Sequence, residues 1–147
     1  HTLDFDAYTS NSVAFNNTCE DNREEGIFVE ETAHGNFIAG NTIRRNGNGI
    51  GVYSNAVGPV ANNVFIGNIV EDNADSGVTA GGYGHVATKH SENNVFIHNL
   101  GKGNGRGLNP QHGSVQGDYW ISNQDDNPNG TWYVVPTNNS GVSMFDP

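Results

Sequence analysis

Residues 60–77 read VANNVFIGNIVEDNADSG, and residues 91–107 read SENNVFIHNLGKGNGRG. In each stretch an asparagine is followed five residues later by a second asparagine, and shortly afterwards by a glycine. These positions are Asn68, Asn73 and Gly77 in the first stretch and Asn99, Asn104 and Gly107 in the second. Self-similarity of this kind indicates a repeat architecture, in which each repeat is one stacking unit.

The same arrangement occurs twice more toward the start of the chain, which gives four coils in one frame. The first asparagines are Asn17, Asn41, Asn68 and Asn99, and the second are Asn22, Asn46, Asn73 and Asn104. The corner glycines are Gly26, Gly49, Gly77 and Gly107. The first asparagines are 24, 27 and 31 residues apart. A constant strand pattern with a growing connection marks one corner as the site of insertions.

Apolar residues align in the same frame and predict the core. Counting by two from the first asparagine, as along an extended strand, predicts three inward columns. They are Val13, Phe37, Val64 and Val95; Phe15, Ala39, Ile66 and Ile97; and Cys19, Ile43, Val70 and Gly101. Short strands follow the corner glycines at 27–30, 50–53, 78–81 and 108–111, with first and third residues inward, and Leu3–Asp6 fits as a fifth. The sequence predicts an all-β solenoid over residues 1–112 and an irregular capping segment of the same domain over 113–147.

Charge and composition exclude several classes of partner. The formal net charge is −10, from 16 Asp and Glu against six Lys and Arg, so a nucleic-acid backbone or an anionic membrane surface would be repelled. The single cysteine, Cys19, excludes an internal disulfide. Sequons at Asn16, Asn129 and Asn138 predict glycosylation and favour an extracellular, secreted protein.

The asparagine and glycine columns resemble the right-handed parallel β-helix repeat of pectate-lyase-like carbohydrate-binding proteins and sugar hydrolases. That group includes pectate lyases, polygalacturonases and mannuronan C5-epimerases. The resemblance covers residues 1–112 and implies the fold and a polysaccharide or oligosaccharide partner lying along an outward strand face. The group's catalytic motifs have no counterpart here, since residues 109–112 read NPQH where the epimerases have Asp-Pro-His. A specific activity therefore does not follow from the resemblance.

The outward column of the strands after the corner glycines supplies the candidate site. It reads Asp6, Glu30, Tyr53, Gly81 and Gln111. Asp6 and Glu30 would lie about 4.8 Å apart at the backbone, so the pair needs a proton, a cation or a substrate. A shared proton would allow the acid and base roles of glycosidic cleavage. The alternatives are that both side chains extend into water, or that they hold calcium together with Asp4.

The longest insertion adds Tyr83, His85 and Lys89 beside this face, near His34 and His112 of neighbouring coils. We expect His85 as a third catalytic residue and the others, with Tyr53 and Gln111, as substrate contacts. Tyr, His and Lys could also supply the base, acid and neutralising charge of a β-elimination. Equally, loop histidines are common without such a role. His1 could chelate copper if another histidine lay near it.

Three classes of function remain open at this point: a polysaccharide-cleaving hydrolase or lyase, a non-catalytic glycan-binding module, and a structural segment. We favour the enzyme. A coil that starts directly on a core strand also exposes an edge and an apolar end. We therefore expect upstream coils or a partner chain to cover the N-terminal end.

Overall fold

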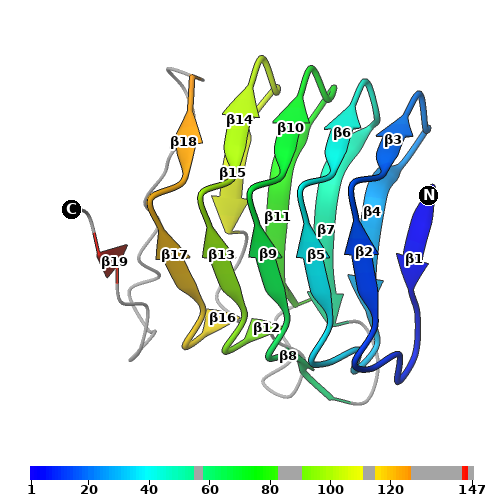
Figure 1. The fold of residues 1–147 in the computed structure, drawn as a ribbon, viewed down its shortest axis with the longest axis vertical. Helices are drawn as coiled ribbons and strands as arrows, with labels where there is room; N and C mark the ends of the chain where they lie inside the picture. The colour runs from blue at the N-terminus through cyan, green and yellow to red at the C-terminus, as the bar shows by residue number, and fades with distance from the viewer. Residues whose placement is uncertain (55–57, 83–90, 111–114, 127–143, 146–147) are drawn as a thin grey trace.

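The computed structural model describes residues 1–54, 58–82, 91–110, 115–126 and 144–145. Within these ranges all regular secondary structure is β-strand, and the paired strands run parallel. Each strand pairs with its equivalents in the coils before and after it, so the coils stack side by side along the molecule (Figure 1). The predicted all-β solenoid is confirmed.

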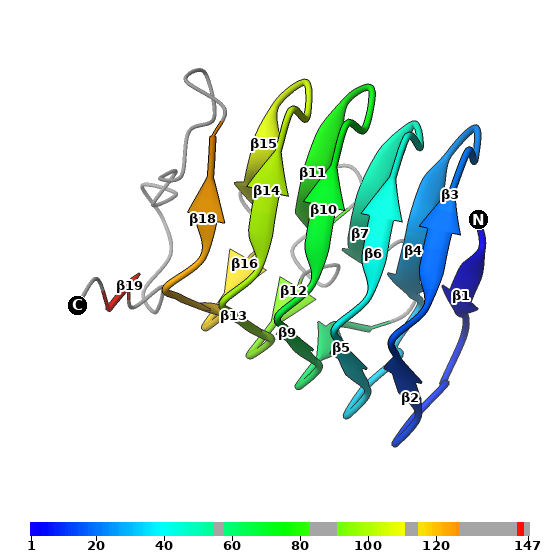
Figure 2. The same cartoon turned by 45° about the horizontal axis from the view of Figure 1, so that its top comes forward.

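Four parallel sheets form the sides of the solenoid (Figure 2). The first sheet, called the A sheet below, contains β1 (Leu3–Phe5), β4 (Glu25–Glu30), β7 (Asn48–Ser54), β11 (Ser76–Gly82) and β15 (Gly107–Pro110). A short sheet contains β8 (Val60–Ala61), β12 (Ser91–Glu92) and β16 (Val115–Gln116).

The other two sheets, called the C and D sheets, consist of very short strands. The C sheet contains β2 (Val13–Phe15), β5 (Phe37–Ala39), β9 (Val64–Ile66), β13 (Val95–Ile97), β17 (Tyr119–Ile121) and β19 (Met144–Phe145). The D sheet contains β3 (Thr18–Glu20), β6 (Thr42–Arg44), β10 (Ile69–Glu71), β14 (Leu100–Lys102) and β18 (Gln124–Asp125). Strands β16 to β18 thus extend the sheets into residues that the sequence analysis assigned to the cap.

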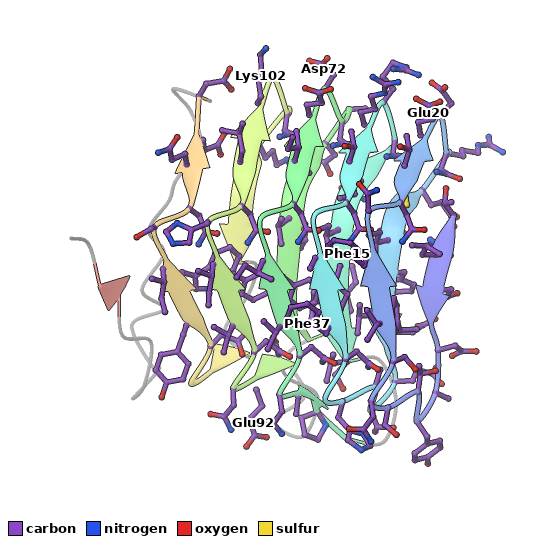
Figure 3. The ribbon with its side chains drawn as sticks, in the orientation of Figure 1. Phe15, Glu20, Phe37, Asp72, Glu92 and Lys102 are labelled. Atoms are coloured by element: carbon purple, nitrogen blue, oxygen red, sulfur yellow. The ribbon has the colours of Figure 1, made fainter. Side chains whose placement is uncertain are left out.

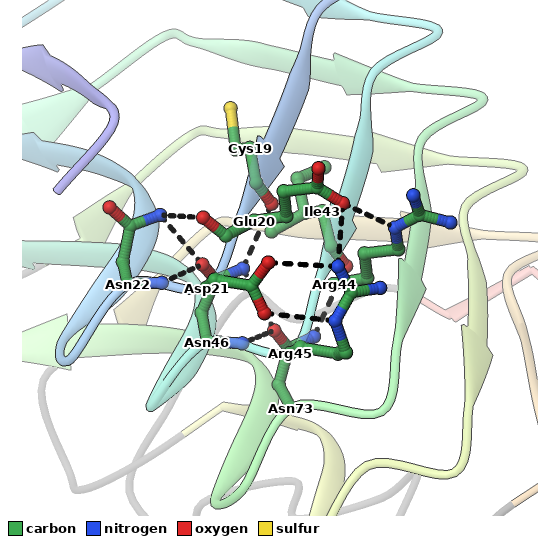
Figure 4. A network of polar contacts seen from close by, with 9 residues as sticks. All are labelled: Cys19, Glu20, Asp21, Asn22, Ile43, Arg44, Arg45, Asn46 and Asn73. Carbon is green, nitrogen blue, oxygen red and sulfur yellow. Dashed lines mark hydrogen bonds and ion pairs between the residues drawn. The ribbon is translucent and has the colours of Figure 1, made fainter.

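The asparagine columns form hydrogen-bonded ladders, as the sequence predicts. The Asn41 amide donates to Asn68 Oδ1 at 3.0 Å, and the Asn68 amide donates to Asn99 Oδ1 at 2.9 Å. The second column repeats this arrangement, with Asn46 Nδ2 3.0 Å from Asn73 Oδ1 (Figure 4). Because these buried amides also donate to backbone carbonyls of the preceding coil, each such asparagine ties three coils together.

A third ladder was not predicted. It consists of Asn36, Asn63 and Asn94, at the corner where the C sheet begins, with 3.0 and 2.9 Å between successive amide nitrogens and oxygens. In the next coil the buried carboxylate of Asp118 takes the asparagine's place and accepts from the backbone N–H of Asn94 at 2.7 Å. The adjacent asparagine pairs at 62–63 and 93–94 were the available sequence signal.

Two of the three predicted inward columns are wrong as columns, although one of their members, Ala39, is buried. Val13 and Phe15 are 68% and 67% exposed, and Phe37 also lies on the outer side of the C sheet (Figure 3). The inward positions are the middle residues of these strands, Ala14, Ile38, Phe65 and Phe96. A corner residue with positive φ precedes each first asparagine, for example Asn16 (φ 56°) and His98 (φ 50°). This left-handed residue interrupts the strand, so a count by two cannot be carried across it.

The remaining core predictions are confirmed. Cys19, Ile43 and Val70 are fully buried on the D sheet, and Cys19 is a free thiol whose pKa is raised by burial. On the A sheet the first and third residues after Gly26, Gly49 and Gly77 are buried in the core, as at Ile27 and Val29. The centre of the core is an aromatic stack, in which the Phe96 ring lies 4.7 Å from Phe65 and 4.0 Å from Trp120.

Candidate functional site

The outward side of the A sheet holds the described residues that suit ligand binding best. The register pairs Asp4 with Phe28, Phe28 with Gly51, and Gly51 with Thr79, as predicted. The neighbouring outward column pairs Glu30 with Tyr53. Because alternate residues of each strand fill the core, these columns form the outward side of the sheet, where Asp4 is exposed, Phe28 and Tyr53 are half-buried, and Gly51 and Thr79 are buried.

Two aromatic rings meet over Gly51. The Phe28 and Tyr53 ring centroids are 5.6 Å apart in an edge-to-face arrangement. A Cβ atom at Gly51 would lie only 2.8 Å from the Tyr53 ring, 2.9 Å from Cγ of Glu25 and 3.0 Å from the Phe28 ring. Glycine at position 51 therefore lets two side chains of β4 and one of its own strand, β7, converge over it. We call Phe28, Tyr53 and Gly51 the aromatic platform.

The imidazole of His1 lies against the platform. Its centroid is 4.8 Å from that of Phe28. Nδ1 lies 3.1 Å from a Glu25 oxygen, and Nε2 lies 3.4 Å from a Glu24 oxygen. Both ring nitrogens thus face carboxylates. Sequence reasoning considered His1 only as a copper ligand beside another histidine and did not anticipate these contacts.

Carboxylates surround the platform. Asp4 and Asp6 are exposed, and Glu25 and Glu30 are half-buried. The pKa of Asp4 is raised, first because burial removes part of its hydration and then because Asp6 places a second negative charge nearby. One oxygen of Asp6 accepts the backbone N–H of Ala7 at 2.6 Å. Asp4 therefore keeps its proton to a higher pH than an ordinary aspartate does.

The predicted pair Asp6 and Glu30 occupies adjacent positions, because Phe5 is in register with Val29 just before them. Their catalytic role stays a prediction. Among the described residues, one group brings three metal-ligating side chains within 4.8 Å of one another, and it consists of His1, Glu24 and Glu25. The oxygens of Asp4, Asp6 and Glu30, the expected calcium ligands, do not all lie within this distance of one another, and calcium binding by these residues stays a prediction.

The other predicted contacts are placed only in part. Tyr53 belongs to the aromatic platform. His34 instead follows the turn after β4 and forms β-bridges with Ser10 and Ala61, and its Nδ1 is 3.0 Å from the Thr32 carbonyl oxygen. Asn16 is exposed at its corner, and its glycosylation stays a prediction. The remaining predicted residues lie outside the residues whose side chains are described: Tyr83, His85, Lys89, Gln111, His112, Asn129 and Asn138.

Basic side chains gather elsewhere. Arg44 and Arg45 extend from β6 and the following corner to Glu20 and Asp21, with nitrogen to oxygen distances of 2.8 to 2.9 Å (Figure 4). These contacts lower the pKa of both acids and raise that of Arg45. The cluster lies at the D sheet, so these two arginines are engaged away from the aromatic platform.

Residues 5–100, more than half of the chain, match the family described as the right handed beta helix region. The chain therefore belongs to the right-handed β-helix family, which agrees with the parallel coils and with the resemblance noted in its sequence. No curated protein and no solved structure matches the chain. None of the described residues forms a helix that is long and apolar enough to cross a membrane.

Proposed function

We propose that this chain is a carbohydrate-active β-helix protein that binds an oligosaccharide stretch of a polymer on the outward side of its A sheet. The aromatic platform carries the proposal. Sugar rings present apolar C–H faces that pack on aromatic rings, while their hydroxyls need polar neighbours. Phe28 and Tyr53 supply the aromatic rings, and the carboxylates of Asp4, Glu25 and Glu30 supply the polar neighbours. Extracellular action on a polysaccharide is part of the proposal.

Hydrolysis is the enzymatic form of this proposal, and the raised pKa of Asp4 supports it. A protonated Asp4 would donate its proton to the leaving oxygen as the glycosidic bond breaks. An ionised carboxylate, Asp6 or Glu30, would accept a proton from the water that attacks the sugar carbon. Lysis of a polyuronate is less well supported, since β1, β4, β7, β11 and β15 contain no Lys or Arg to neutralise the sugar carboxylate.

Binding is tested by calorimetric titration with hexasaccharides of several neutral and charged sugars, using Phe28→Ala. Phe15→Ala is the matched control, because it removes the same side chain from the exposed side of the C sheet. Phe28→Ala should weaken binding about ten-fold, which is about 1.4 kcal/mol, and Phe15→Ala should leave it unchanged. Equal effects of the two variants, or no binding of any hexasaccharide, would refute the proposed face.

Cleavage is tested by mass spectrometry of products formed in water labelled with oxygen-18. Hydrolysis should add one labelled oxygen per broken bond, and Asp4→Asn should slow it at least 100-fold, as loss of a general acid does. Products with an unsaturated end would show a lyase instead. Binding without products would leave the chain a glycan-binding module.

A further inference from the structure

The charged residues in the strands of the A sheet are all acidic. Three carboxylates, Asp4, Glu25 and Glu30, lie in these strands, whereas Lys and Arg are absent from them. Asp6 follows β1 directly, and Glu24 precedes β4. Beyond the arginines paired with Glu20 and Asp21, Arg106 pairs with Asp75 at 2.7 Å. Arg23 is exposed in the corner before β4. His1 lies against this face and meets Glu24 and Glu25, but one imidazole does not balance the five carboxylates, so the described residues leave the face with an excess of negative charge.

The contacts of His1 show what this face accepts. A flat nitrogen-bearing ring lies on Phe28, and its two nitrogens point to Glu25 and Glu24. An aromatic ring flanked by carboxylates is the environment that stabilises a positively charged nitrogen, through cation–π attraction and charge-assisted hydrogen bonds. An ammonium group attached to a sugar ring would find the same partners.

A buried hydroxyl adds a second feature to the same column. Thr79 lies opposite Gly51 in register and is only 1% exposed. Its Oγ1 has no hydrogen-bond partner in the described structure. An unpartnered buried hydroxyl is costly, so a ligand group that pairs with it gains binding energy. The outward column therefore offers a neutral hydrogen-bonding group beside the charged and aromatic ones.

We infer that the saccharide is a polymer of amino sugars with free ammonium groups, an inference that rests on the proposed function of this face. A uronic acid polymer would add further carboxylates to the same surface and would bind only together with a cation. The ammonium sugars take the place of the His1 imidazole, with their rings on the platform and their nitrogens toward Glu25 and Glu24.

The test compares two hexasaccharides of the same linkage, the hexamer of glucosamine and the hexamer of N-acetylglucosamine, by calorimetry at pH 6. They have the same sugar backbone and differ in the charged amine. The glucosamine hexamer should bind at least ten-fold more tightly at low salt, and the advantage should shrink several-fold at 0.5 M NaCl because salt screens exposed charges. Glu25→Gln should reduce the advantage, and Glu71→Gln, which removes a charge from β10 of the D sheet, should not.

The outcomes separate this inference from the proposed function. Equal binding of the two hexamers, sensitive to Phe28→Ala, would overturn the preference for amino sugars and leave the saccharide-binding face standing. A failure of the chain to bind either hexamer or any other saccharide would overturn both. Preferential binding of glucosamine that Glu71→Gln weakens as much as Glu25→Gln would show attraction to the net charge of the chain and would overturn the assignment to this face.

Discussion

Replacement of a single ladder asparagine is a severe test of how the solenoid is stabilised. Asn68 is fully buried and takes part in four side-chain hydrogen bonds. Its amide nitrogen donates to Asn99 Oδ1 at 2.9 Å and to the Ile38 carbonyl at 3.0 Å. Its oxygen accepts from the backbone N–H and the side-chain amide of Asn41, both at 3.0 Å.

Asn68→Ala removes all four bonds and leaves the buried N–H of Asn41 without its acceptor. Each bond contributes about 1 kcal/mol net, and an orphaned buried donor costs about 1–3 kcal/mol, so we expect a loss of about 5 kcal/mol or more. A loss of this size is a large fraction of the about 5–15 kcal/mol that stabilises a typical domain.

Asn17→Ala is the matched control in the same column. Asn17 is half-buried, and its side chain makes one hydrogen bond, from Nδ2 to Asn41 Oδ1 at 3.0 Å. We expect a loss of about 1 kcal/mol. Urea unfolding followed by far-ultraviolet circular dichroism gives both free energies of unfolding. If the two variants lost stability to within about 0.5 kcal/mol of each other, the ladder would not contribute through the bonds counted above.

Three further predictions follow from individual contacts. Because the pKa of Asp4 is raised in the folded chain, ionisation of Asp4 destabilises the fold; Asp4→Asn should raise the melting temperature at pH 7, with the difference disappearing near pH 3. Gly49→Ala should lower the free energy of unfolding by about 3 kcal/mol or more, since the new Cβ would lie 2.2 Å from the Gly77 carbonyl oxygen. Gly67 has a φ of 61° and open space around it, so Gly67→Ala should cost only about 1–2 kcal/mol; urea unfolding measures both losses. Phe96→Ala removes the middle ring of the aromatic stack and should cost about 3–5 kcal/mol by the same assay.

The asparagine ladders could be predicted from sequence because their periodicity is a direct consequence of stacking. Identical amides in successive coils donate and accept along one line, so the same residue recurs at each corner. The inward residues of the C sheet could not be found by counting, because the left-handed corner residue was invisible in the pattern. The left-handed corner residue is a glycine in one coil, Gly67, but a histidine in the next, His98. Periodicity within a strand is informative only between such corners.

The candidate site could be predicted from the sequence only in part. Its columns followed from the repeat, and the register of Glu30 with Tyr53 and of Phe28 with Gly51 is as predicted. The convergence of side chains over Gly51 and the seating of His1 were not predictable, because they depend on rotamers of side chains that no repeat constrains. The available signal was a glycine in an outward column next to a phenylalanine.

The position of the site follows from where the solenoid tolerates change. Hydrogen-bonded asparagines in successive coils are 24, 27 and 31 residues apart along the chain, and the next step is again 24. The three-residue strands and their ladders repeat without insertion on the C and D sheets, so the additional residues fall between β7 and β8 and between β11 and β12. Both connections leave the same end of A-sheet strands, beside the outward columns. Ligand-contacting residues can therefore vary at this corner while the ladders hold the sheet in register, which is why we place binding on the A sheet rather than on the apolar outer side of the C sheet.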